Sequence, residues 1–127
     1  MKFKYTILYV EDVAAAIAFF ETAFGFQKGM IHESGDYGEL VTGETKLAFS
    51  AFSLMTSLGK SPAKANPTAP VFELAFETEN VEQAVEKALK AGATLVQKAE
   101  KMPWGQTIAY VSEPNGFLIE ICTPVAA

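Results

Sequence analysis

Hydrophobic and polar residues alternate in several short runs of the chain, and other stretches repeat apolar residues at helical spacing. Residues 4–10 alternate and are rich in β-formers, which predicts a strand. Asp12 is typical of a helix N-cap and Gly25 of a left-handed C-cap, so the apolar stripe between them predicts a helix. Three further strands are then predicted, at residues 27–32, 37–42 and 45–52, the last two joined in a hairpin about Gly43.

The same order of elements is predicted a second time. Residues 71–78 alternate, and Asn80 with Gln83 forms a capping-box pattern for a helix that Gly92 ends. Strands follow at residues 93–98, 107–112 and 117–123, the last two joined at the turn Glu113-Pro114-Asn115-Gly116. Because Glu11-Asp12-Val13 aligns with Glu79-Asn80-Val81, we interpret the chain as an internal repeat.

This pattern predicts an α+β protein built from two tandem β-α-β-β-β modules that form an open, concave mixed sheet. We expect one domain over residues 1–127, with modules at about 3–52 and 71–123 and a linker at 53–70. The linker is rich in Pro, Ser, Lys and Ala, which is typical of a lid over a binding site or of a passive connector.

Each helix covers one face of its strands, so functional residues are expected on the opposite face. Two modules side by side would make a trough lined by alternate strand residues. Alternation places Glu73 and Glu120 there, and an ionised carboxylate in such a place needs solvent, a cation or hydrogen-bond donors. The further candidates from this parity are Tyr5, Tyr9, Gln106 and Tyr110, and Tyr37, Glu39 and Ser50 from the first hairpin.

Trp104 lies in the loop Met102-Pro103-Trp104-Gly105-Gln106, before a predicted strand. A large ring in such a loop either caps the core or offers a stacking surface to a flat ligand. The single histidine, His32, lies in a polar turn, which favours a surface position over catalysis. The sequence contains neither a nucleophile-elbow motif nor a phosphate-binding or dinucleotide-binding glycine pattern.

The composition and charge of the chain limit the classes of partner that it can bind. The net charge is −5 and the estimated isoelectric point 4.8, with scattered lysines, which argues against nucleic-acid binding. The acidity favours either simple solubility or a cationic ligand. Cys122 is the only cysteine, so no intrachain disulfide forms. No apolar run reaches membrane-spanning length and the N-terminus lacks a signal-peptide pattern, so we expect a cytoplasmic protein without a membrane partner.

The chain resembles the glyoxalase/bleomycin-resistance/dioxygenase superfamily, also called the vicinal-oxygen-chelate superfamily. The resemblance covers nearly the whole chain. Its marks are residues 5–13, the end of the first helix at Phe24-Gly25-Phe26, residues 73–81, Pro103-Trp104-Gly105-Gln106, and the run from Glu113 to Glu120. It implies two paired β-α-β-β-β modules, a small-molecule ligand and a homodimer.

The resemblance also implies where a metal would bind. In metal-dependent relatives the ligands come from the first strand, the strand after the linker and the last strand, often as His, His and Glu, and a fourth comes from the first hairpin. Those positions are Tyr5, Glu73, Glu120 and, roughly, Ser50 here, so only Glu120 matches. Since a facial triad needs imidazoles, we expect no transition-metal cofactor; a divalent metal would depend on Glu73 and Glu120.

Two functions follow from the resemblance, and a purely structural or interaction module with an empty trough is a third possibility. The leading one is a small-molecule-binding protein that sequesters a drug or metabolite, as in antibiotic resistance of the bleomycin type. Its rings would be Tyr5, Tyr9, Phe52, Trp104 and Tyr110, and its acids Glu73 and Glu120. The alternative is a glyoxalase-like lyase or isomerase, or a dioxygenase. In that case Glu73 and Glu120 would hold a divalent metal, and one of these carboxylates would act as the catalytic base.

Overall fold

The computed structural model describes residues 1–125, and the chain forms two compact units that divide between Lys64 and Ala65. Each unit has the same β-α-β-β-β order and an open, four-stranded mixed sheet, which confirms the predicted fold class. Among the described residues, no helix combines the length and apolar character needed to cross a membrane.

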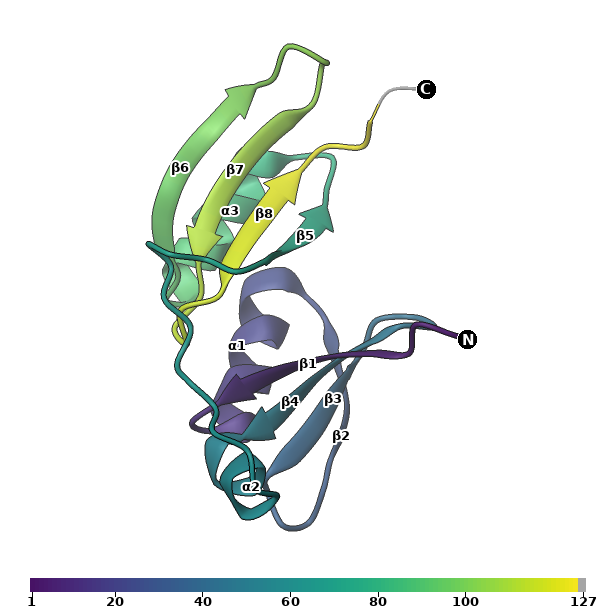
Figure 1. Ribbon diagram of the computed structural model, residues 1–127. Helices are drawn as coiled ribbons and strands as arrows, with labels where there is room; N and C mark the ends of the chain where they lie inside the picture. The colour runs from purple at the N-terminus through teal and green to yellow at the C-terminus, as the bar shows by residue number, and fades with distance from the viewer. Residues whose placement is uncertain (126–127) are drawn as a thin grey trace. The chain divides into compact units, whose positions relative to one another are not determined.

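The first unit has a helix packed on one face of its sheet (Figure 1). Its strands lie in the order β1-β4-β3-β2, with β1 parallel to β4 and the other pairs antiparallel. The elements are β1 (Tyr5–Val10), α1 (Val13–Phe24), β2 (Gln27–Ile31), β3 (Tyr37–Val41), β4 (Lys46–Ala51) and α2 (Phe52–Ser57).

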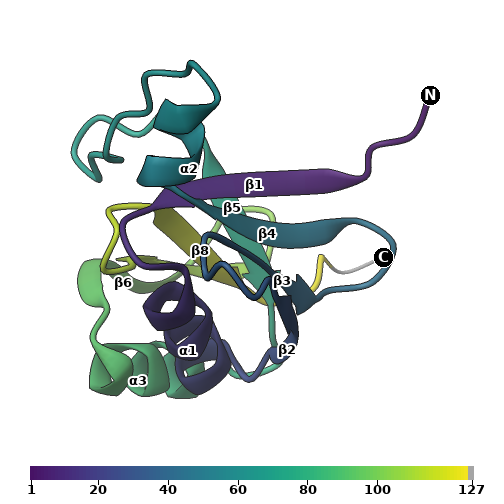
Figure 2. The ribbon, with the colours of Figure 1, turned by 90° about the horizontal axis from the view of Figure 1, so that it is seen from below.

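Local sequence explains the ends of α1 and its close packing on the sheet (Figure 2). The Asp12 carboxylate accepts a hydrogen bond from the backbone N–H of Ala15 at 3.0 Å, and Gly25 adopts a left-handed conformation after the last turn. Gly38 on β3 lets the helix approach, because a Cβ there would lie 2.6 Å from Cδ1 of Ile17. The Phe20 and Phe49 rings, both fully buried, meet at 5.2 Å between their centres.

The second unit repeats this topology, in the order β5-β8-β7-β6 with β5 parallel to β8. The Asn80 side chain accepts from the backbone N–H of Gln83 at 3.1 Å, and Gly92 ends the helix in a left-handed conformation, as predicted. The elements are β5 (Glu73–Glu77), α3 (Val81–Ala91), β6 (Thr94–Lys101), β7 (Thr107–Ser112) and β8 (Leu118–Cys122).

Two predictions need correction at the edges of elements. The expected linker does not begin as irregular chain: its first residues belong to α2, which buries Met55. Phe52, expected at the end of a strand, is the first residue of that helix because β4 ends at Ala51. The reason is that the apolar residues Leu54 and Met55 continue the apolar character of β4 before the proline-rich part starts.

Candidate functional site

Three of the predicted site residues meet on the open face of the second sheet. Tyr110 on β7 pairs with Glu120 on β8, and Ala75 on β5 pairs with Glu120 from the other side. The Tyr110 hydroxyl lies 3.0 Å from Oε1 of Glu120 and 3.4 Å from Oε2 of Glu73. We call Glu73, Tyr110 and Glu120 the acidic cluster. Strand pairing and the two-residue period of side chains bring the three groups together, as the sequence predicted.

The acidic cluster has more hydrogen-bond acceptors than donors. A phenol carries one proton, whereas two ionised carboxylates offer four oxygens. The shorter distance assigns that proton to Glu120. Burial, and next the hydrogen bond to Glu120, raise the pKa of Tyr110 to about 12, so the hydroxyl remains a donor at neutral pH.

In the described part of the chain, no cationic side chain balances these carboxylates. Among the described residues, no lysine lies within ion-pair distance of Glu73 or Glu120, and the chain contains no arginine. The thiol of Cys122 lies near the same negative charge. Burial, and next the charge of Glu120, raise its pKa. The acidic cluster therefore suits a ligand that brings positive charge and N–H donors.

A second group lies at the turn between β6 and β7. Indole Nε1 of Trp104 donates to Oε1 of Gln106 at 2.7 Å, and Nε2 of Gln106 donates to the carbonyl of Thr123 at 2.8 Å. Trp104 is 59% exposed, so it does not cap the core. Gln106 falls on the same side of β7 as Tyr110, because strand residues alternate. Sequence reasoning found Trp104 and Gln106 but not Thr123, whose contact uses only its backbone.

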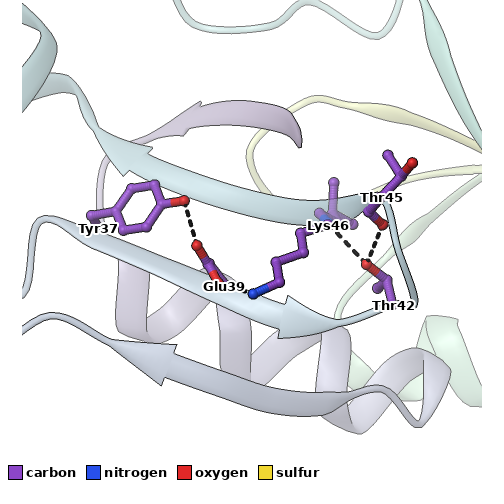
Figure 3. Close-up of polar contacts among 6 residues, drawn as sticks. Tyr37, Glu39, Thr42, Thr45 and Lys46 are labelled. Carbon is purple, nitrogen blue, oxygen red and sulfur yellow. Dashed lines mark hydrogen bonds and ion pairs between the residues drawn. The ribbon is translucent and has the colours of Figure 1, made fainter. Parts of the chain in front are cut away.

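The first sheet carries a different polar group on its open face (Figure 3). The Tyr37 hydroxyl donates to Oε2 of Glu39 at 2.8 Å, and Nζ of Lys46 donates to Oε1 at 3.0 Å. The hydrogen bond from Tyr37 and the charge of Lys46 lower the pKa of Glu39, while burial and Glu39 raise that of Tyr37. Glu39 likewise raises the pKa of Lys46. We call Tyr37, Glu39 and Lys46 the compensated cluster.

The remaining predicted residues are spread over the first unit. Tyr5 and Tyr9 lie on the edge strand β1, 44% and 36% exposed. Ser50 pairs with Tyr9 in the sheet and is buried, while Phe52 lies in α2. Tyr37 and Glu39 were predicted as candidates. Lys46 was missed, although the Tyr-x-Glu spacing signals a shared face that a partner from β4 could join.

The donor set of the acidic cluster does not fit a transition metal. Two carboxylates and a protonated phenol lack the imidazoles that such metals favour. His32 lies in the exposed turn between β2 and β3, where its Nδ1 accepts from the backbone N–H of Ser34 at 3.2 Å. Within residues 1–125, no group of three or more His, Cys, Asp or Glu side chains is placed to hold a metal ion.

Two α+β units of β-α-β-β-β order define the class of protein, and comparison with known proteins gives the family. A family model for the glyoxalase-like domain matches residues 3–126, so the chain belongs to that family. No curated protein matches the sequence.

Solved structures agree with the family at low identity and show the fold alone. A glyoxalase/bleomycin resistance protein/dioxygenase family enzyme from Burkholderia phytofirmans PsJN is 24% identical, with a TM-score of 0.80 over 99% of this chain and 100% of that one. A glyoxalase-related enzyme from Fulvimarina pelagi is 20% identical, with a TM-score of 0.84 over 98% and 88%. TioX from Micromonospora sp. ML1 is 18% identical, with a TM-score of 0.71 over 97% and 98%.

Proposed function

We propose that this chain is a small-molecule-binding protein that captures a positively charged ligand on the acidic cluster. Capture is stoichiometric sequestration of the bleomycin-resistance type and does not depend on a transition metal. The observation that carries the proposal is the single phenolic proton placed between two carboxylates that have no lysine partner among residues 1–125. We further propose that the protein is a cytoplasmic homodimer; the dimer follows the family resemblance, and sedimentation of the purified protein tests it.

The physical argument is one of charge and of donor number. An ammonium or guanidinium group supplies several N–H donors to carboxylate oxygens, and such charge-assisted hydrogen bonds are about twice as strong as neutral ones. Tyr110 holds Glu120 in place while leaving the remaining carboxylate oxygens to the ligand. Binding therefore requires little rearrangement of side chains, which lowers its entropic cost.

Calorimetric titration of chelator-treated protein with spermidine and with a bleomycin glycopeptide tests the proposal. Glu73→Gln and Glu120→Gln should each weaken binding by about tenfold, the effect of losing one charge-assisted hydrogen bond. Glu77→Gln is the matched control, because Glu77 is exposed on the same face of β5 and is not one of the two carboxylates hydrogen-bonded to Tyr110. Its effect should be clearly smaller and should disappear at high salt.

Two results would overturn the proposal. If Glu77→Gln weakens binding as much as Glu120→Gln, the ligand responds to general acidity and not to the acidic cluster. If Zn, Ni, Mn or Mg binds stoichiometrically below micromolar concentration, and Glu73→Gln or Glu120→Gln abolishes that binding, a metal-dependent lyase, isomerase or dioxygenase becomes the better assignment.

A further inference from the structure

The turn between β6 and β7 holds an exposed aromatic ring by two hydrogen bonds in series. The turn is tight: Gly105 N–H donates to the carbonyl of Met102 at 2.9 Å, with Pro103 at its second position and Gly105, at φ +101°, at its fourth. Trp104 therefore projects from the tip with more than half of its surface in solvent. The indole N–H of Trp104 nevertheless donates a hydrogen bond to Gln106, and the amide of Gln106 donates one to the carbonyl of Thr123.

The amide of Gln106 can make this bridge because it carries both an acceptor and a donor. An indole N–H is a donor without acceptor capacity, and a backbone carbonyl only accepts. The residue between them must accept at one atom and donate at another, which Gln106 does with Oε1 and Nε2. A carboxylate would lose the donor side, and an aliphatic chain would lose both sides. The two partners thus fix the orientation of the amide and, through it, the direction of the indole.

A fixed ring in solvent contributes little to the core but much to recognition. Ordering a free side chain on binding costs about 0.5–1.5 kcal/mol, and a ring that is already ordered avoids that cost. Rigid aromatic rings are efficient contact surfaces for this reason. The anchoring atom is the Thr123 carbonyl, directly after β8, so the ring is tied to the strand that also carries Glu120.

We propose that Gln106 is a positioning residue that holds the Trp104 indole as a stacking surface for a planar aromatic group of the ligand. The inference rests on the proposed function, because it gives the cationic ligand a second feature. Gln106 and Tyr110 are four residues apart on one face, which is about 13 Å along an extended strand. The anchoring amide and the acidic cluster thus belong to one face of the second sheet, and the ligand class is a planar aromatic ring that carries a positively charged group.

The first test needs no ligand. Trp104 is the only tryptophan, so fluorescence anisotropy decay and acrylamide quenching of the protein report on this ring alone. Gln106→Ala should increase its fast motion and its quenching, with an unchanged unfolding midpoint. Gln106→Glu should free the ring nearly as much, because a carboxylate cannot donate to Thr123. Gln83→Ala, an exposed amide on α3, is the matched control. A ring that stays equally fixed in Gln106→Ala or Gln106→Glu overturns the proposal.

The second test separates the ring from the charge. Aminoacridine is a planar aromatic cation, whereas spermidine is a cation without a ring. Trp104→Ala should weaken aminoacridine binding about tenfold and Gln106→Ala about three- to tenfold, while spermidine binding stays unchanged. Glu120→Gln should weaken both probes.

The outcomes distinguish the two ideas. If Gln106→Ala leaves aminoacridine affinity unchanged, or weakens spermidine equally, the positioning role is wrong while the acidic cluster stands. If Glu120→Gln changes neither probe, the proposed function is wrong, and the positioning role then stands only if Gln106→Ala still weakens aminoacridine. A protein that binds neither probe overturns both.

Discussion

The two units share one topology but treat the carboxylates on their open faces in opposite ways. In the first unit, Glu39 receives hydrogen bonds from both Tyr37 and Lys46. In the second unit, Glu73 and Glu120 share one phenolic proton and have no lysine partner within the described residues. The compensated cluster is complete within its unit, whereas the acidic cluster has one donor for two carboxylates. A duplicated fold can thus compensate a carboxylate in one copy and leave the equivalent face of the other copy with fewer donors than acceptors.

The two long helices, α1 and α3, also differ in how many of their residues are buried. The first helix buries six residues, including Phe19 and Phe20, whereas α3 buries only Val81 and Ala88 and carries Glu82, Glu86, Lys87 and Lys90. Four phenylalanine rings pack together under the first sheet: Phe19, Phe20, Phe24 and Phe49. Because burial of apolar area is the main stabilising contribution to folding, the first unit should contribute more stability per residue than the second.

The largest expected effect tests this difference between the helices. Phe20→Ala removes a fully buried ring and should lower the free energy of unfolding by about 3–5 kcal/mol. Leu89→Ala on α3 removes a side chain that is 37% exposed and should cost less than about 1 kcal/mol. Urea denaturation followed by circular dichroism measures both. Similar costs at the two positions would show that the helices contribute equally.

The next prediction concerns the point at which the second unit begins. Gly116 has φ +94°, and a Cβ there would lie 2.2 Å from the carbonyl oxygen of Ala65, the first residue of that unit. Gly105 has a similar φ of +101° but open space around a Cβ. Gly105→Ala should therefore cost about 1–2 kcal/mol from backbone strain alone, and Gly116→Ala clearly more. Equal midpoints of thermal unfolding in the two variants would mean that the segment beginning at Ala65 is not fastened to the turn.

The sequence was sufficient for the repeat because caps and alternation are local signals. Asp12 and Asn80 begin equivalent helices, and Gly25 and Gly92 end them. The acidic cluster could also be predicted from the sequence, since the alternation of side chains along a strand places Glu73, Tyr110 and Glu120 on one face.

The parts that could not be predicted depend on register or on backbone atoms. Lys46 reaches Glu39 only because β3 and β4 pair as they do, with Glu39 opposite Ala48. Gln106 is anchored by the carbonyl of Thr123, to which any residue type contributes the same atom. The short helix α2 was missed because the proline-rich composition of the segment as a whole masked its first residues.

A smaller effect should appear at the compensated cluster as the pH falls. The pKa of Glu39 is lowered in the folded protein, so its contribution to stability is present above its unfolded value of about 4.3 and is lost as pH falls through the folded pKa. Glu39→Gln should cost about 1 kcal/mol at neutral pH and less in acid. Unfolding midpoints of this variant and of the unchanged protein, measured from neutral to acidic pH, test this; a cost that stays constant into acid would contradict it.

The smallest expected effect lies in the alkaline range, at Tyr110. Its folded pKa of about 12 exceeds the unfolded value of about 10, so its stabilising contribution is complete below pH 10 and is lost as pH rises towards 12. Tyr110→Phe should change stability at neutral pH by less than about 1 kcal/mol, because the carboxylates it leaves behind can be solvated. Ultraviolet absorbance of tyrosinate should lose one late step of the titration in this variant. If the lost step instead has its midpoint near pH 10, Tyr110 does not donate to Glu120, and the hydrogen bonds that define the acidic cluster are wrong.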